Sequence, residues 1–190
     1  MSTAAVRAPD QPALADLVMV TPHALSAEHC TRLIERFEAA EEQQICEKPG
    51  GHSFTQIEIT KAWPDEHAFL LPLFLEHFQN YQRCTGSTYW PRNIGYEHLR
   101  VKRYLPNGRD WFAPHVDVVD QLTARRFMTA FIYLNAPKGG ETVFPTLGLV
   151  IPPETGKLLS FPPLWLFPHE GRAPVSAPKY ILHTYLCYGE

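Results

Sequence analysis

The sequence predicts a mainly β domain, a sandwich or jelly roll, with supporting helices near its N-terminus. Beyond residue 95, short runs rich in β-branched and aromatic residues alternate with turn residues, as in antiparallel β domains. Nine of the 18 prolines fall between Pro137 and Pro178, a density that excludes long helices from that segment. A length of 190 residues with 45% apolar composition suits one domain with one core.

The first elements are predicted from capping and periodicity. Residues 1–16 mix Ala, Pro and Asp, and we expect them to form a flexible leader. Residues 17–20 are apolar and predict a short buried strand. Ser26 is a preferred N-cap residue, and an amphipathic helix is predicted over about 27–42. The apolar residues at helical spacing are Cys30, Leu33, Ile34 and Phe37.

A strand and a second helix are predicted next. Residues 48–51, Lys-Pro-Gly-Gly, interrupt the first helix, and residues 54–60 alternate apolar and polar side chains as a strand does. Asp65 is a candidate cap for a helix over about 66–84, in which Pro72 is expected to cause a kink. The apolar face of that helix is Phe69, Leu70, Leu73, Phe74 and Phe78.

The second half supplies the remaining strands. They are predicted over residues 96–104, 127–134, 147–151, 158–161 and 180–188. We therefore expect one domain over residues 17–190, with two helices packed on a distorted antiparallel barrel that spans about 96–190.

Composition restricts the compartment and the partners. The formal net charge of -3 lacks the basic excess of nucleic-acid-binding domains. No apolar run approaches the roughly 18 residues of a membrane helix, and residues 1–16 lack the apolar region of a signal peptide. The four cysteines form no Cys-x-x-Cys pair and are typical of free thiols in a reducing compartment. We expect a cytoplasmic protein with no nucleic-acid or membrane partner; the sequence sets no oligomeric state.

His115 and Asp117 form the most informative polar motif. On a strand, residues i and i+2 point to the same face, so both side chains would project together. An imidazole and a carboxylate can occupy adjacent positions on one metal. A second histidine would complete a two-histidine, one-carboxylate face that leaves three positions open for Fe(II) oxygen chemistry. A His-x-Asp motif alone is weak, because solvated loop pairs share its spacing.

Two downstream histidines are candidates for the third ligand. His169 lies in Phe-Pro-His-Glu, ten residues before Lys179. His183 lies on the predicted terminal strand, where Lys179, Ile181, His183 and Tyr185 share one face. From the residues alone, His183 could be a ligand, a neighbour of the metal or a core histidine.

Several motifs follow one another in the second half of the chain. They are Arg103-Tyr-Leu-Pro-Asn-Gly108, His115-x-Asp117, Arg126-x-x-Thr129, Tyr133-Leu-Asn135, Gly139-Gly-Glu-Thr-x-Phe-Pro145, His169, Pro174-Val175 and Lys179. In this order they resemble the catalytic core of the prolyl 4-hydroxylase-like branch of the 2-oxoglutarate and Fe(II)-dependent oxygenases. The ordered set is specific, although each piece alone is not.

The resemblance implies a fold and a metal centre. The fold is a double-stranded β-helix of the jelly-roll, cupin-like kind. The cofactor is Fe(II), held by His115, Asp117 and His169. The cosubstrates are 2-oxoglutarate and O2, with ascorbate as a reductant.

The resemblance also assigns the cosubstrate pocket. Lys179 would bind the distal carboxylate of 2-oxoglutarate, and an unpaired buried lysine is costly enough to call for such an anion. The residues implied to line the pocket with it are Tyr104, Tyr133 and Thr129. The residues implied beside the metal or on the substrate side are His183, Arg126 and Tyr185. Tyr185 departs from the tryptophan that many relatives carry there.

The implied activity is hydroxylation of an unactivated C–H bond. Kinship favours a prolyl residue in a peptide or protein, and a free amino acid or small biosynthetic intermediate is the alternative. Relatives that transfer halogen replace the carboxylate ligand with a small residue, so Asp117 favours hydroxylation. Residues 45–64 and 118–124 are expected to border the mouth of the site and select the substrate.

Two other interpretations describe a protein that is not an oxygenase. A non-catalytic module that binds metal and 2-oxoglutarate would usually have lost a ligand or the lysine. A cupin-like metal protein would have no use for Lys179.

Overall fold

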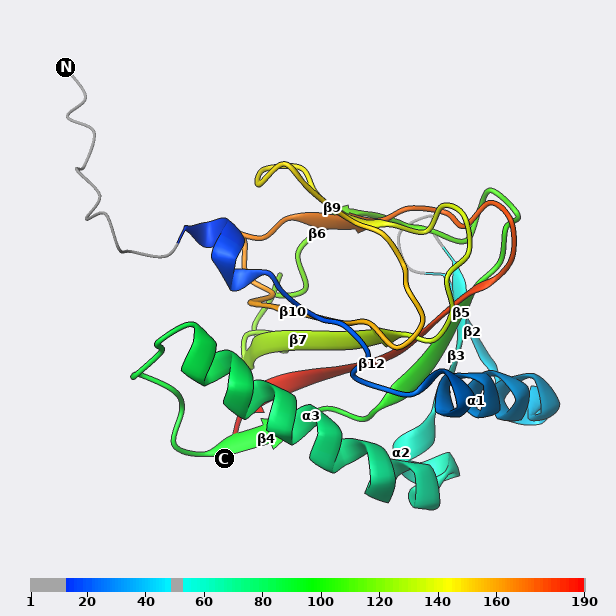
Figure 1. The fold of residues 1–190 in the computed structure, drawn as a ribbon, viewed down its shortest axis with the longest axis horizontal. Helices are drawn as coiled ribbons and strands as arrows, with labels where there is room; N and C mark the ends of the chain where they lie inside the picture. Colours follow the sequence, from blue (N-terminus) through cyan, green and yellow to red (C-terminus); the bar gives the residue numbers. More distant parts are fainter. Residues whose placement is uncertain (1–12, 49–52, 190) are drawn as a thin grey trace.

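Two antiparallel sheets and three helices make up the part of the chain that the computed structural model describes, residues 13–48 and 53–189 (Figure 1). The larger sheet has the order β1-β10-β7-β12-β5-β3-β2, and β4 also pairs with β12. Its strands are β1 (Met19–Thr21), β2 (Ile45–Glu47), β3 (Phe54–Glu58), β4 (Ile94–Tyr96), β5 (Arg100–Tyr104), β7 (Arg126–Tyr133), β10 (Leu158–Phe161) and β12 (Lys179–Tyr188).

The smaller sheet has the order β6-β11-β8-β9 and lies above the larger one in Figure 1. Its strands are β6 (Phe112–His115), β8 (Thr142–Phe144), β9 (Leu149–Ile151) and β11 (His169–Gly171). The two sheets enclose an interior between them, which is the arrangement of a jelly roll. The fold class predicted from the sequence is confirmed.

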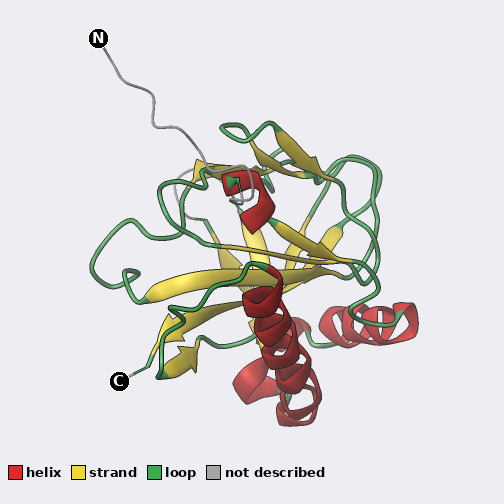
Figure 2. Cartoon of the chain, turned by 60° about the vertical axis from the view of Figure 1, so that its left-hand side comes forward, coloured by secondary structure: helices red, strands yellow, loops and turns green. Residues whose placement is uncertain are grey.

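The helices cover the outer face of the larger sheet. Figure 2 shows the two long helices, α1 (Ala27–Ala39) and α3 (Pro64–Cys84), on the same side of the strands. The short α2 (Ile59–Ala62) leads from β3 into α3. Ser26 caps α1 by accepting a hydrogen bond from the backbone N–H of His29, at 3.2 Å. Apolar residues of α1 and α3 pack against the larger sheet in one core, which includes Leu33, Phe37, Phe74, Val101, Ile132 and Leu182.

A second core fills the interior between the sheets and is rich in aromatic residues. It includes Phe54, Tyr104, Phe131, Tyr133, Phe144, Phe161, Phe167 and Ile181. Alternation along the strands produces this division, because successive side chains point to opposite faces. On β12, Tyr180 and Leu182 face the helices, whereas Ile181 faces the interior. The interior face of the larger sheet therefore borders the space between the sheets, where a binding site can form.

Several predicted boundaries were wrong. Residues 17–20 are not a buried strand: Leu14–Leu17 forms a 3-10 turn and β1 follows it, half-buried. The first helix ends at Ala39 rather than at residue 42. The strand predicted to reach residue 60, β3, ends at Glu58, and α2 follows it directly.

The second helix and the later strands also differ in detail. Trp63, not Asp65, is the N-cap of α3, and Pro72 lies inside the helix without ending it. The predicted strand 96–104 is divided into β4 and β5, and 147–151 begins only at Leu149. Four strands were not predicted, β2, β6, β8 and β11, each of three or four residues.

Some predictions fall on residues outside the described part. Residues 1–12 of the expected leader and 49–51 of the interruption after the first helix are among them. Within the described part, Tyr81 donates its hydroxyl to the carbonyl of Leu17 at 2.8 Å, which attaches the residue that follows the expected leader to α3. Cys30, Cys46, Cys84 and Cys187 are free thiols. No helix among the described residues has the length and apolar character needed to cross a membrane.

Candidate active site

His115 and His169 face each other across neighbouring strands of the smaller sheet. His115 ends β6, His169 begins β11, and the two are direct partners in the antiparallel register. Asp117 follows two residues after β6. Its carboxylate oxygens lie 3.3 Å from Nε2 of His115 and 3.8 Å from Nε2 of His169. One atom from each side chain therefore lies within 4.8 Å of the others, close enough to share one ion.

Backbone carbonyls fix the orientation of both imidazoles. Nδ1 of His115 is 2.7 Å from the carbonyl oxygen of Ala113, and Nδ1 of His169 is 3.0 Å from that of Phe167. A carbonyl accepts only, so Nδ1 carries the proton and Nε2 keeps its lone pair. Such outer hydrogen bonds orient histidines that bind metals.

Asp117 reaches the histidines by a route that differs from the prediction. We expected His115 and Asp117 to share one face of a strand, but β6 ends at His115. The backbone N–H of Asp117 donates to the carbonyl of Pro163 at 3.2 Å, which turns the chain after the strand. The carboxylate is held beside the imidazoles by this turn rather than by strand alternation.

The charges of the three groups suit a cation. Burial alone would raise the pKa of Asp117, but the neighbouring His169 and His115 hold it well below its usual range. Burial lowers the pKa of His169, which favours its neutral form. An ionised carboxylate with two neutral imidazoles is the donor set that non-haem Fe(II) sites use on one face. The residues present therefore fit Fe(II).

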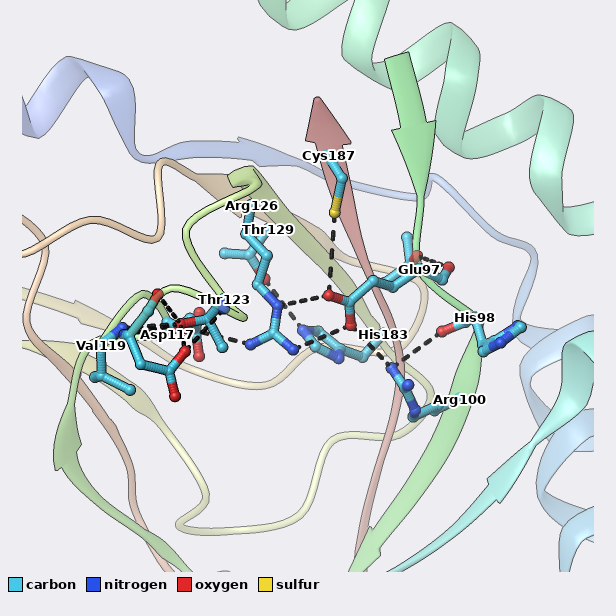
Figure 3. A network of polar contacts seen from close by, with 12 residues as sticks. Glu97, His98, Arg100, Asp117, Val119, Thr123, Arg126, Thr129, His183 and Cys187 are labelled. Carbon is cyan, nitrogen blue, oxygen red and sulfur yellow. Dashed lines mark hydrogen bonds and ion pairs between the residues drawn. The ribbon is translucent and has the colours of Figure 1, made fainter. Parts of the chain in front are cut away.

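A network of polar contacts includes Asp117 and Arg126 (Figure 3). Arg126 of β7 donates to the backbone carbonyl of Asp117 at 3.2 Å and to both carboxylate oxygens of Glu97, at 2.7 and 3.1 Å. The guanidinium lies 4.0 Å from the ring centroid of Tyr185. Burial, followed by the nearby Asp117, raises the pKa of Tyr185. Arg126 thus fixes the backbone of Asp117.

Lys179 lies deeper in the same cavity. It is 4% exposed, and its Nζ donates to the carbonyl of Gly140 at 3.2 Å. The ammonium lies 4.6 Å from the ring centroid of Tyr104, its direct partner in the register between β12 and β5. Burial lowers the pKa of Lys179 to about 8, although Glu141 opposes the shift. Among the described residues Lys179 forms no ion pair, so the site holds a buried cation without a carboxylate.

The other predicted pocket residues take different places. Tyr104 and Thr129 line the cavity with the metal cluster and Lys179. Tyr133 lies behind this lining: its hydroxyl is 2.7 Å from the hydroxyl of Thr142, which does face the cavity. His183 lines the cavity but stands outside the metal cluster. Nε2 of His183 is 3.1 Å from Thr129 Oγ1, and its buried Nδ1 has no hydrogen-bond partner.

The sequence analysis missed several residues of the lining. They are Lys102, Phe112, Phe131, Thr142, Phe161, Gly171 and Ile181. Lys102 was the one with a usable signal, because it precedes Tyr104 by two residues on a predicted strand and so shares its face. The apolar members could not be distinguished from ordinary core residues.

The predicted mouth segments lie beside the cavity only in part. In the loop 118–124, the N–H of Val118 also donates to the carbonyl of Pro163, at 3.3 Å. The ring of Phe54, from the segment 45–64, lies 5.6 Å from that of Tyr104 and 5.9 Å from that of Phe112. Their expected part in substrate selection remains a prediction.

Comparison with known proteins finds a family model that matches the part of the chain that carries this geometry. Residues 99–187 match the family model described as the 2OG-Fe(II) oxygenase superfamily. The match contains the three clustered side chains, Lys179, Arg126 and Tyr185. No curated protein sequence matches the chain.

Solved structures similar to this chain carry the same fold. A viral collagen prolyl hydroxylase from Paramecium bursaria Chlorella virus-1, in its 2OG complex, is 22% identical with a TM-score of 0.66, covering 92% of this chain and 97% of its own. A Pseudomonas putida prolyl-4-hydroxylase is 18% identical with a TM-score of 0.64, covering 93% and 100%. A Trichoplax adhaerens prolyl hydroxylase, in complex with a hypoxia inducible factor peptide fragment, is 17% identical with a TM-score of 0.70, covering 91% and 84%.

Proposed function

We propose, for a chain whose residues 99–187 belong to the 2OG-Fe(II) oxygenase superfamily, that it hydroxylates an unactivated C–H bond with Fe(II), 2-oxoglutarate and O2. The family makes the protein a dioxygenase. The observation that carries the proposal is the placement of a buried, anion-free lysine in the same cavity as a two-histidine, one-carboxylate cluster.

The cluster would hold the iron. His115, Asp117 and His169 contribute one donor atom each, and all three line the cavity that Lys179 also lines. When bound, Fe(II) and 2-oxoglutarate supply O2-dependent oxidation of a C–H bond, coupled to decarboxylation of the cosubstrate to succinate. The protein keeps the imidazoles in the metal-binding tautomer and the carboxylate ionised.

Lys179 would bind the distal carboxylate of 2-oxoglutarate. Its ammonium is fixed between the carbonyl of Gly140 and the ring of Tyr104, so little side-chain freedom is lost on binding. Burial penalises the isolated ammonium, and a carboxylate would relieve that penalty. The aromatic rings that line the cavity reduce its polarity, which strengthens the ion pair.

We propose a prolyl group as the oxidised part of the substrate, supported by kinship with prolyl hydroxylases. It could be presented within a peptide or as a free small molecule. We also propose ascorbate as a reductant that keeps the iron in the Fe(II) state. A cytoplasmic location is proposed from the four free thiols.

The test is anaerobic titration of the Fe(II)-loaded protein with 2-oxoglutarate, followed by the weak visible charge-transfer band of the chelate. We expect a band in the wild type, none in His169→Ala, and a band reached only at much higher 2-oxoglutarate concentration in Lys179→Ala. Lys138→Ala, at an exposed lysine, is the control and should match the wild type. A wild-type protein that binds Fe(II) but forms no band with 2-oxoglutarate would disprove the proposal.

A further inference from the structure

Lys102 is a second cation on the interior face of the larger sheet. It lies on β5 two residues before Tyr104, and alternation turns both side chains into the cavity that His115, Asp117 and Lys179 also line. Its neighbour Val101 faces the helices instead. Lys102 is therefore directed at the site by the strand itself.

Lys102 has no carboxylate partner among the described residues. Its Nζ instead makes a cation–π contact, 5.0 Å from the ring centroid of Phe54. Such a contact supplies less than an ion pair when the ammonium is withdrawn from water. Burial lowers the pKa of Lys102 to about 8, the same direction as for Lys179. The cavity thus contains two ammonium groups that need an anion.

The acidic groups near Lys102 are already engaged. Glu97 accepts two hydrogen bonds from Arg126 and also lies 3.6 Å from a guanidinium nitrogen of Arg100. Asp117 belongs to the metal cluster. Bound 2-oxoglutarate would use its distal carboxylate on Lys179 and its other end on iron. After these pairings, Lys102 is the cation that remains.

A polar atom accompanies Lys102 on the same face. In the register of β5 with β12, Lys102 is opposite Ile181 and Arg100 is opposite His183, so Lys102 and His183 are diagonal neighbours. Nδ1 of His183 is buried and lacks a hydrogen-bond partner. An ammonium and a free ring nitrogen on one wall of the cavity form a recognition site for a small polar group.

We propose that Lys102 binds a carboxylate of the substrate, so that the molecule oxidised is a carboxylic acid rather than an internal residue of a polypeptide. A carboxylate fits better than a phosphate, because one lysine balances a single negative charge and Arg100 and Arg126 are held by Glu97. An internal prolyl residue offers only neutral amides and would leave the half-buried Lys102 without an anion. A free amino or imino acid, or a residue at a peptide C-terminus, has the required group. The inference rests on the proposed function and specifies its substrate.

The test compares acids with their primary amides on the anaerobic Fe(II)- and 2-oxoglutarate-loaded protein. The probes are the twenty standard amino acids, proline included, each with its amide, and dipeptides that end in the same residue as acid or amide. Binding is read from perturbation of the charge-transfer band and from ligand-observed NMR. In the wild type we expect at least one acid to bind about tenfold or more tightly than its amide, the effect of a charge-assisted hydrogen bond.

Variants assign that preference to Lys102. Lys102→Met should remove the difference between acid and amide while 2-oxoglutarate affinity stays within about twofold of the wild type. Lys102→Arg, which keeps the charge, should retain the preference, and Lys138→Met should change nothing. Preference for free acids over acid dipeptides would identify a small-molecule substrate; equal preference would identify a chain terminus.

Three outcomes would overturn the inference. The first is a panel in which no acid binds more tightly than its amide. The second is a Lys102→Met protein that keeps the preference. The third is a Lys102→Met protein that loses 2-oxoglutarate affinity, which would assign Lys102 to the cosubstrate. Failure of the proposed function is separate, because the wild type would then show no band with 2-oxoglutarate before any probe is added.

Discussion

His115 and His169 are held by the same device, a hydrogen bond from Nδ1 to the carbonyl oxygen of the residue two positions earlier. The acceptors are Ala113 and Phe167, and the two rings end with centroids 4.3 Å apart. Each imidazole is therefore oriented by a backbone carbonyl of its own segment, before any metal binds. The site is preorganised, so its predicted behaviour can be tested residue by residue.

Removing one imidazole should abolish metal binding without unfolding the protein. We expect His169→Ala to lower the affinity for Fe(II), or for Co(II) as a stable substitute, by more than about 100-fold, since outer contacts alone contribute 10–100-fold. His183→Ala is the matched control, a buried histidine of the same cavity outside the cluster, and should bind metal normally. Anaerobic calorimetry measures both. Loss of metal in His183→Ala with retention in His169→Ala would reverse the ligand assignment.

The affinity for 2-oxoglutarate should fall at high pH. Lys179 has a pKa of about 8 in the free protein, and only its ammonium form attracts the carboxylate. Binding above that pH requires uptake of a proton, so the affinity should be constant below pH 8 and decrease up to about tenfold per pH unit above it. Titration of the charge-transfer band from pH 6.5 to 9.5 gives the profile.

Lys179→Arg is the control for that profile. A guanidinium keeps its charge throughout this range, so its 2-oxoglutarate affinity should not depend on pH, whatever its absolute value. A wild-type affinity that is flat to pH 9.5 would contradict the assignment of Lys179 to the cosubstrate. Equal decreases in both proteins would place the titration on another group.

Tyr185 should contribute to metal affinity through Asp117. Tyr185→Phe removes the hydroxyl whose pKa the nearby Asp117 helps to raise, and it keeps the ring beside Arg126. We expect metal affinity to fall by about tenfold, in the range for outer-sphere partners of metal ligands. Tyr188→Phe, at an exposed tyrosine of the same strand, should have no effect. Unchanged affinity in Tyr185→Phe would restrict the role of Tyr185 to packing.

The sequence predicted the elements that strong local signals define. Ser26 with a helical apolar repeat predicted α1, and the long β-rich run near the C-terminus predicted β12, which carries Lys179 and His183. The strands that hold the histidines were missed, because β6 and β11 have four and three residues and the motif Ala-Pro-His shows no alternation. Short strands form through pairing with distant partners, which local patterns do not record.

The residues of the candidate site also divide into those that the sequence indicated and those that depend on distant pairing. Ordered motifs indicated His115, Asp117, His169 and Lys179, and the structure brings all four to one cavity. Lys102 was overlooked because a lysine on a strand is usually solvent-exposed, and its face is set by pairing with β12. The hydrogen bond from Arg126 to the backbone carbonyl of Asp117, and the approach of Tyr185 to Asp117, depend on the fold and cannot be read from spacing.

Gly140 should be required for the cosubstrate and not for the metal. Its φ of +77° lies in the left-handed region, and a Cβ there would be 2.9 Å from Cδ of Lys179. Gly140→Ala therefore combines backbone strain with displacement of the lysine. Gly148→Ala is the matched control, because Gly148 has φ +66° with open space around it, so only the strain of roughly 1 kcal/mol applies.

Both variants should unfold at similarly lower denaturant concentrations. We expect Gly140→Ala alone to lose about tenfold in 2-oxoglutarate affinity, with Co(II) affinity unchanged in both. Equal 2-oxoglutarate affinities in the two variants would mean that Lys179 tolerates displacement, and the pairing of its ammonium with the cosubstrate would have to be reconsidered.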